Sequence, residues 1–465
     1  MIKLYNSLTK TIEELKPINP KEVTVYSCGP TVYDYPHIGN WYSFIRYDLL
    51  IRTLTLANYS LKWVINITDV GHLTSDADDG EDKIHKTALA NHQSAWEISK
   101  FYSQYFIDGM SRLNFIKPYK IPYATNEIDS QIDFINKLQE LGYTYEIAGD
   151  GIYFDSSKFP RYADFARLNL SDEDQEHHRI ELNPNKRHPS DFALWKFSLK
   201  DSKRDMEWES PFGTGFPGWH IECSAMCLKY LGPTIDIHAG GIDHIPIHHT
   251  NEIAQSEALN NKPLAHIWLH NNHVLINNEK ISKSLGNGIT LEDILSKGFS
   301  LNSFRLLVVE SHYRSQSQFN FNNLKSAQIR LNRIAKFAEL KYQLKSNTNE
   351  KETITPRSVF EAMENDLNSP KSLAYFDQFI SNIDLTTLSK NSVEQITNDL
   401  NNLYGIKLVT KDITEDQKDL IKARQSLREI KDFNGSDKIR DQLLGQGLEL
   451  TDSPIGTLWS RTINY

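Results

Sequence analysis

The segment VTVYSCGPTVYDYPHIGN, residues 23–40, decides the fold class of this chain. Its first six residues alternate and are rich in β-branched side chains, a pattern that predicts a strand over 23–28. A turn rich in glycine and proline follows, and then apolar residues recur at helical spacing over about 41–56. Residues 60–67 again have the composition of a strand. A strand, a crossover helix and a second strand form a βαβ unit, which predicts a parallel sheet and an α/β fold.

The composition is typical of a soluble globular protein. Of the 465 residues, 39% are hydrophobic and 24% are charged, so the chain is too apolar to be disordered and long enough for about three domains. The formal charge of −9 argues against a uniformly basic surface but not against a local basic patch. Three cysteines exclude a secreted disulfide scaffold, and the sequence has no signal segment and no run of 18 apolar residues. We therefore expect a cytoplasmic protein without a membrane partner.

Changes of pattern divide the chain into three parts. We expect an α/β domain over 1–320, with an insertion over about 115–218 whose residues 143–218 are rich in turns, aromatic residues and charges. Within this domain a helix is expected over 248–259. Helical, polar sequence follows over 321–405, and residues 406–465 hold two helical stretches and a short GLEL strand.

Two short motifs have the chemistry of a polyphosphate site. HIGN, beginning at His37, is predicted at the N-terminus of a helix, where unpaired N–H groups and the helix dipole favour phosphate. Its Gly39 allows a ligand to approach the backbone closely. KISKS places Lys280 and Lys283 three residues apart, so both ammonium groups can reach one polyphosphate. Taken alone, each motif also fits a simpler interpretation, a capping histidine and a solvated basic loop.

Two cysteines, a histidine and a glutamate could form a zinc site. His248 and Glu252 are four residues apart, so they share one face of a helix. With Cys28 and Cys223 they would complete a plausible tetrahedral shell. Spacing alone leaves two alternatives open, because the chain has no CxxC motif: a shell that uses Cys227, one helical turn from Cys223, or buried free cysteines.

Nine segments resemble, in order, the cysteinyl-tRNA synthetases, a family of class I aminoacyl-tRNA synthetases. Seven lie between residues 28 and 316: CGPTVYDYPHIGN, NITDVGHL, DFALWK, GFPGWHIECSAM, DIHAGGIDHIPIHHTNEIAQS, EKISKSLGN and HYRSQ. KDFNGSDKIRDQL and GTLW near the C-terminus resemble the last domain of the same family. Two positions depart from the family pattern: Asn40 replaces a histidine in the first motif, and Ile281 replaces a methionine in the second.

The resemblance implies a fold and a set of domains. Residues 1–320 would form a split Rossmann-type catalytic domain whose KISKS-containing region spans about 265–320. Residues 321–405 would form a helical tRNA-binding bundle, and 406–465 a small anticodon-recognition domain. The insertion is too short for a full editing domain.

The resemblance also implies roles for single residues. The catalytic residues would be His37, Lys280 and Lys283. ATP, with Mg²⁺, would be bound by His37, Gly39, Asn40, Gly240, Gly241, Asp243, Lys280 and Lys283. Cysteine would be bound by Thr31, Thr68, Trp219 and His238. The zinc ligands would be Cys28, Cys223, His248 and Glu252, with Cys227 outside the shell. Four other histidines are expected to be structural or merely polar: His220, His244, His249 and His270.

The implied activity is that of a cysteine–tRNA ligase. Cysteine would attack the α-phosphate of ATP, release pyrophosphate, and then pass from the adenylate to the 3′-terminal ribose of tRNA(Cys). Shape separates cysteine from serine by only about 1–3 kcal/mol, whereas zinc binds a soft thiolate far better than a hydroxyl. The tRNA would contact basic residues of the C-terminal region, and the protein would be a monomer. These basic residues are Lys325, Arg330, Arg333, Lys336, Lys341, Lys345, Lys422, Arg424, Arg428, Lys431, Lys438 and Arg440.

Two alternative functions are less consistent with the sequence. A related ligase could transfer the cysteinyl adenylate to a small aminosugar, but such an acceptor needs no tRNA-binding bundle after residue 320. A non-catalytic, zinc-dependent tRNA-binding module would need neither HIGN nor KISKS.

Overall fold

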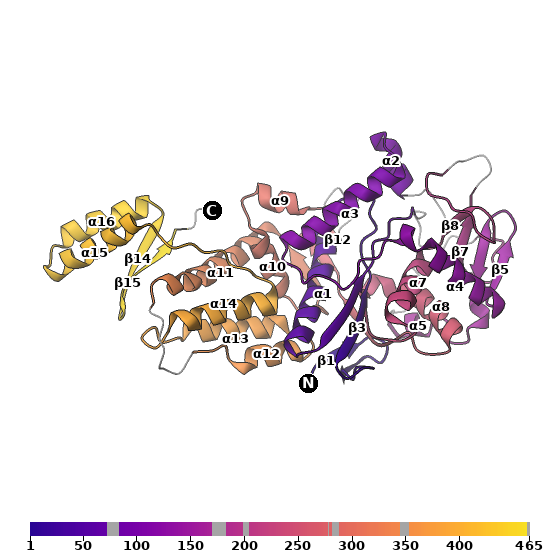
Figure 1. Ribbon diagram of the computed structural model, residues 1–465, viewed down its shortest axis with the longest axis horizontal. Coiled ribbons are helices and arrows are strands. Elements are labelled where there is room, and N and C mark those ends of the chain that lie inside the picture. The colour runs from indigo at the N-terminus through magenta and orange to yellow at the C-terminus, as the bar shows by residue number, and fades with distance from the viewer. Residues whose placement is uncertain are drawn as a thin grey trace. The chain divides into compact units, whose positions relative to one another are not determined.

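The computed structural model describes residues 1–71, 83–169, 183–198, 204–277, 279–280, 288–344 and 353–462 (Figure 1). The chain divides into two compact units. The first comprises Met1–Thr290, Tyr313–Gln318 and Asn365–Leu367, and the second comprises Leu291–His312, Phe319–Glu364 and Asn368–Tyr465. The functional domain boundaries at 320 and 405 stay predictions, because a compact unit need not coincide with a functional domain.

A four-stranded parallel sheet organises the first unit, with the strand order β10-β9-β3-β4. Its strands are β3 (Glu22–Ser27), β4 (Ser60–Ile65), β9 (Ile235–Gly241) and β10 (Ala265–Asn271). Helix α1 (Ile38–Leu56) connects β3 to β4, which confirms the predicted βαβ unit. The helix begins at Ile38 rather than at Trp41, because the side chain of His37 caps it.

Between the end of β4 and residue 218 the chain forms helices and a separate antiparallel sheet. The helices are α2 (Lys83–Asn91), α3 (Ala95–Arg112), α4 (Ile128–Glu140) and α5 (Asp164–Asn169), with short 3-10 turns at Ala124–Glu127 and Ser156–Lys158. The sheet has the order β5-β6-β7-β8 and consists of β5 (Thr144–Ile147), β6 (Gly151–Phe154), β7 (Phe192–Phe197) and β8 (Gly215–Pro217). It is the short-stranded insertion predicted from the turn-rich composition.

The first unit also contains a hairpin, two longer helices and a small sheet of short strands, of which β13 extends by one residue into the second unit. These elements are the hairpin β1 (Lys3–Asn6) and β2 (Thr11–Glu14), the helices α7 (Trp219–Leu231) and α8 (Thr250–Asn260), and the short strands β11 (Val274–Ile276), β12 (Glu279–Lys280) and β13 (Ser317–Phe319). Two short turns, Ile242–His244 and a π-helix at Ile245–His249, lead from β9 into α8. The helix predicted over 248–259 therefore begins at Thr250.

The second unit is helical apart from one hairpin. Its helices are α9 (Leu291–Ser296), α10 (Leu301–Val309), α11 (Phe321–Glu339), α12 (Arg357–Glu364), α13 (Ser369–Ser381), α14 (Lys390–Tyr404), α15 (Glu415–Glu429) and α16 (Phe433–Gly445). The GLEL strand is β14 (Leu448–Ser453), and it pairs with a second strand that was not predicted, β15 (Gly456–Arg461). None of the helices in the described ranges combines the length and the hydrophobicity needed to cross a bilayer. The predicted α/β fold with a helical C-terminal region is confirmed.

Candidate active site

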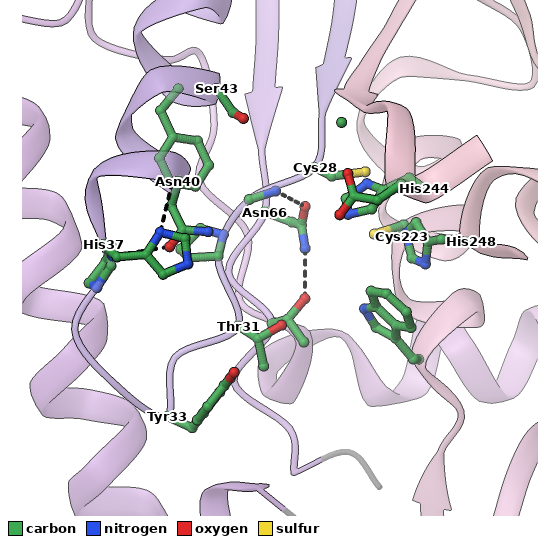
Figure 2. Close-up of a pocket in the computed structure, with 18 of the residues that line it drawn as sticks. Cys28, Thr31, Tyr33, His37, Asn40, Ser43, Asn66, Cys223, His244 and His248 are labelled. Carbon is green, nitrogen blue, oxygen red and sulfur yellow. Dashed lines mark hydrogen bonds between the residues drawn. The ribbon is translucent and has the colours of Figure 1, made fainter. Parts of the chain in front are cut away.

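A cavity of about 290 Å³ lies beyond the carboxyl ends of β3 and β4, within the first unit. This is where parallel α/β sheets bind ligands. Figure 2 shows two opposite ends of the cavity, with Cys28, Cys223 and His248 at one and His37 and Asn40 at the other. Residues predicted to serve the metal, the amino acid and ATP thus share one cavity. The predicted residues that line it are Cys28, Thr31, His37, Asn40, Thr68, Trp219, Cys223, Gly241, Asp243 and His248.

The sulfur-containing end has the donor atoms of a metal site. One donor atom each from Cys28, Cys223, His248 and Glu252 lies within 4.8 Å of the other three, and all four residues are buried. Glu252 Oε1 is buried and lies 3.0 Å from His248 Nε2. Two sulfurs, an imidazole nitrogen and a buried carboxylate oxygen match the ligand preferences of zinc. The residues present therefore fit the predicted metal.

The electrostatics of this cluster favour charged ligands. A hydrogen bond from Cys28 lowers the pKa of Cys223 to about 6 despite its burial. Burial lowers the pKa of His248, but Glu252 and Cys223 outweigh it and raise that pKa to about 10. Burial raises the pKa of Cys227, whose sulfur is not among the clustered donor atoms. Without a metal, bound protons reduce the repulsion between the negative groups of the cluster. A metal cation could take the place of these protons.

A second ring of histidines surrounds the same cluster. His238 Nε2 lies 3.0 Å from Glu252 Oε2, and His249 Nε2 lies 3.3 Å from the sulfur of Cys28. His249 in turn contacts His270, with 2.7 Å between Nδ1 and Nε2. His249 was expected to be structural or merely polar, yet it contacts a predicted metal ligand. Its place in the π-helix, directly after His248, is the signal that could have identified it.

At the opposite end, the HIGN motif forms the cap of α1. His37 Nδ1 accepts from Asn40 N at 3.3 Å, and Asn40 Oδ1 accepts from His37 N at 3.1 Å. Because Nδ1 is an acceptor, the neutral imidazole carries its proton on Nε2. His37 Nδ1 is therefore engaged in the cap, and Asn40 keeps its amide Nδ2 as a donor.

The KISKS motif lies largely outside the described residues. Only the main chain of Lys280, in β12, belongs to them, and Lys283 does not. The chain that follows the motif reaches the HIGN helix, since Ile38 N donates to the Ile289 carbonyl at 2.8 Å. This contact places Ile289, five residues after Ser284 in the sequence, next to the first motif.

Glycines at the end of β9 allow close packing of side chains beside the cavity. A Cβ atom at Gly240 would lie 2.3 Å from the His249 ring, and one at Gly241 would lie 2.3 Å from Asp243 Oδ1. Neither position can hold a side chain without rearrangement. Gly240, His238 and Glu252 lie behind the lining residues, and Gly39 is inside the first turn of α1.

The floor of the cavity is tied together by an asparagine that the sequence interpretation missed. Asn66 Oδ1 accepts from Gly29 N at 2.9 Å, and Asn66 Nδ2 donates to Thr68 Oγ1 at 3.1 Å. Thr68 also forms a parallel bridge with Thr31. A polar residue just beyond the carboxyl end of a parallel strand was the signal for Asn66. Cavity-lining residues that were not predicted also include Ser43, Tyr47 and His244.

Some basic residues of the second unit do not fit the predicted contact with tRNA. Arg424 is only 3% exposed and donates to Asp452 at 2.9 and 3.1 Å. Arg330 donates to Glu310 at 2.8 Å and to Asp377 at 2.7 Å. Both arginines hold elements of the unit together, so the predicted basic patch is smaller than the sequence indicated.

Comparisons with known proteins agree on a family. The family described as tRNA synthetases class I (C) catalytic domain matches residues 14–329. A cysteine–tRNA ligase of Treponema denticola is 40% identical, with 99% of each chain covered. A cysteine–tRNA ligase of Borrelia garinii subsp. bavariensis is 39% identical, with 98% of this chain and 99% of the relative covered.

Solved structures show the same fold at low identity. A methionyl-tRNA synthetase of Mycobacterium tuberculosis bound by methionyl-adenylate has a TM-score of 0.58 at 12% identity, covering 83% of this chain and 92% of that one. A leucyl-tRNA synthetase of Agrobacterium radiobacter K84, in a ternary complex with tRNA, has a TM-score of 0.61 at 11% identity, covering 84% and 85%. At these identities the likeness concerns the fold alone.

Proposed function

The chain belongs to the cysteine–tRNA ligase family of class I tRNA synthetases, and from this premise we propose that it activates cysteine with ATP and transfers it to the 3′-terminal ribose of tRNA(Cys). The observation that carries the proposal is the cavity itself, which combines a sulfur-rich donor set with a helix N-terminus that presents neutral donors. Cysteine and a nucleoside triphosphate are the two ligands that these opposite ends suit.

Zinc is the proposed metal of the sulfur-rich end. Cys28, Cys223, His248 and Glu252 would hold it, and Cys227 would stay outside. When bound, zinc supplies a soft Lewis acid that prefers the thiolate of cysteine to the hydroxyl of serine. Trp219, whose ring centroid lies 4.3 Å from that of His248, would then form one wall of the amino-acid site. Thr31 and Thr68 on the cavity floor, with His238 behind the cluster, complete the proposed cysteine site.

The helix end of the cavity would bind the triphosphate. His37 Nε2 and the Asn40 amide donate toward it, Gly39 lets it approach α1, and the dipole of the helix adds positive potential. The ribose would lie over Gly240 and Gly241, where Asp243 can accept from its hydroxyl groups.

Charge stabilisation is the main catalytic requirement of the first step. The carboxylate of cysteine is already a nucleophile, so its attack on the α-phosphate needs positioning and charge stabilisation rather than a general base. We assign that role to His37, Lys280 and Lys283, with Mg²⁺ on the phosphates. Transfer to the ribose of the tRNA then completes the reaction, and we propose that a monomer in the cytoplasm carries it out.

The decisive experiment combines pyrophosphate exchange with metal analysis. We expect ATP–pyrophosphate exchange that depends on cysteine and not on serine, and one zinc ion per chain. Cys223→Ser should lose both the zinc and the exchange. Cys227→Ser is the matched control, since it removes a buried thiol one helical turn away and should keep both. Exchange that survives the loss of zinc would refute the metal's role in selectivity, and exchange without acylation of tRNA would favour a small acceptor.

A further inference from the structure

An aromatic surface lies at the rim of the cavity. Tyr35, which itself lines the cavity, packs against three rings of α3, those of Phe101, Tyr102 and Tyr105. The ring centroids are 6.1, 5.1 and 4.8 Å from that of Tyr35, and the rings meet at steep angles of 76–90°. Tyr35 is 43% exposed and Phe101 53% exposed, so the surface presents aromatic area to solvent.

The hydrophobic core does not require this surface. The buried side of α3, which carries Tyr102 and Phe106, already supplies the core: Phe106 is fully buried and stacks on Trp41 at a centroid distance of 5.5 Å. Phe101 could be polar without loss to that packing. Gathered exposed aromatic rings are typical of a binding surface.

Position and charge indicate which partner the rings would bind. Because Tyr35 belongs to both the surface and the cavity, a chain that enters the cavity on this side passes over the rings. Lys100 and Asp34, both exposed, flank the rings with opposite charges, so phosphate attraction contributes little there. Unpaired bases stack on aromatic side chains through their faces, without needing a positive surface.

We propose that Tyr35, Phe101 and Tyr105 form a stacking platform for the unpaired 3′-terminal nucleotides of the tRNA. This inference rests on the proposed function, which requires the 3′-terminal ribose to reach the adenylate in the cavity. The platform would act in transfer and leave adenylate formation unaffected.

The test uses the full-length protein and two forms of tRNA(Cys), intact and lacking its unpaired 3′ nucleotides. The wild type should bind the intact form at least about fivefold more tightly, the lower end of what one stacked base contributes. Phe101→Ala should bring the ratio of the two affinities close to one. It should also lower kcat/KM for aminoacylation by a similar factor. Its cysteine-dependent pyrophosphate exchange should be unchanged, because Phe101 does not line the cavity.

Two control variants sharpen the result. Phe101→Trp keeps an aromatic face and should preserve the affinity ratio. Tyr119→Ala removes a ring that is 59% exposed but does not pack on Tyr35, and it should change neither the ratio nor transfer. The inference is overturned if Phe101→Ala weakens both tRNA forms equally, if the ratio is unaffected, or if the variant changes only the oligomeric state. Absence of exchange in the wild type would instead refute the proposed function.

Discussion

At the scale of single residues, the cavity is organised by which atoms donate and which accept. The reciprocal hydrogen bonds between His37 and Asn40 use Nδ1 of the ring and Oδ1 of the amide as acceptors. The neutral ring then carries its proton on Nε2, and Nδ2 of the Asn40 amide is a donor that can face a ligand. The family pattern has a histidine at position 40, which would present an imidazole N–H. In this chain the donor at that position is the amide of Asn40.

Asn40→Asp separates the capping role from the ligand-binding role. The aspartate keeps the acceptor for His37 N and suits the first turn of a helix, so thermal stability should be unchanged. It also removes a donor and places a negative charge facing the triphosphate. We expect KM for ATP in pyrophosphate exchange to rise by about tenfold, equivalent to about 1.4 kcal/mol. An unchanged KM would show that Asn40 only caps the helix.

Glycine is required at position 29 because the backbone segments that carry Gly29 and Asn66 approach each other closely. A Cβ atom there would lie 1.6 Å from the carbonyl oxygen of Asn66, so Gly29→Ala must displace the backbone that carries the cavity floor. We expect the free energy of unfolding to fall by about 1–3 kcal/mol. Gly445→Ala is the matched control, because no atom lies within 4 Å of its Cβ position and alanine favours the helix. Chemical denaturation of both variants measures the difference.

At the scale of elements, long-range polar contacts hold the C-terminal helices to their hairpin. Arg424 of α15 donates to Asp452 of β14, and Thr457 of β15 donates to the same carboxylate. The second strand, which the sequence interpretation missed, is therefore part of the contact that fixes α15. A strand of GTLWSR composition next to a chain end gives a weak local signal, and the pairing with β14 stabilises it.

The Asp452 contact should depend on pH in a defined window. Hydrogen bonding from Arg424 lowers the pKa of Asp452 to about 2, below the value of about 3.9 in an unfolded chain. A depressed pKa contributes stability that is present above about pH 4 and is lost as the pH falls toward 2. Because Asp452 is half exposed, we expect Asp452→Asn to cost only about 1 kcal/mol or less at pH 7. Thermal unfolding at several pH values should show the two proteins converging in acid, and a constant difference would contradict this assignment.

At the scale of the whole molecule, the cavity and the C-terminal region are separate in the chain. All residues that line the cavity lie between Cys28 and His248, in the first unit. Residues after 405 contribute to a small core of their own, formed by Ile413, Leu443, Leu448 and Trp459. Adenylate formation and recognition of the tRNA body should therefore be separable.

A chain that ends at Gly405 tests this separation. We expect it to retain cysteine-dependent pyrophosphate exchange within about twofold, while kcat/KM for aminoacylation falls by about tenfold or more, because contacts to single-stranded bases of the tRNA are lost. Measuring both activities on the same preparation supplies the control. Equal losses in the two assays would mean that the C-terminal residues support the catalytic unit itself.

The sequence by itself determined the local features of this protein. The βαβ unit, the helix that starts at HIGN, the short-stranded insertion and the helical C-terminal region follow from patterns within about twenty residues, because periodicity and turn chemistry act over such distances. The family resemblance is of the same kind, since it rests on short segments in order, and it is confirmed.

Only the tertiary structure decided which residues meet. It brings Cys28, at the end of β3, to Cys223 in α7, places His249 against the Cys28 sulfur, and ties Gly29 to Asn66 across the cavity floor. It also buries Arg424, one of the residues predicted to contact tRNA, and pairs it with Asp452. The physical reason is that burial and pairing depend on partners far apart in the chain, so a residue's type reveals what it can bind but not which neighbour it has.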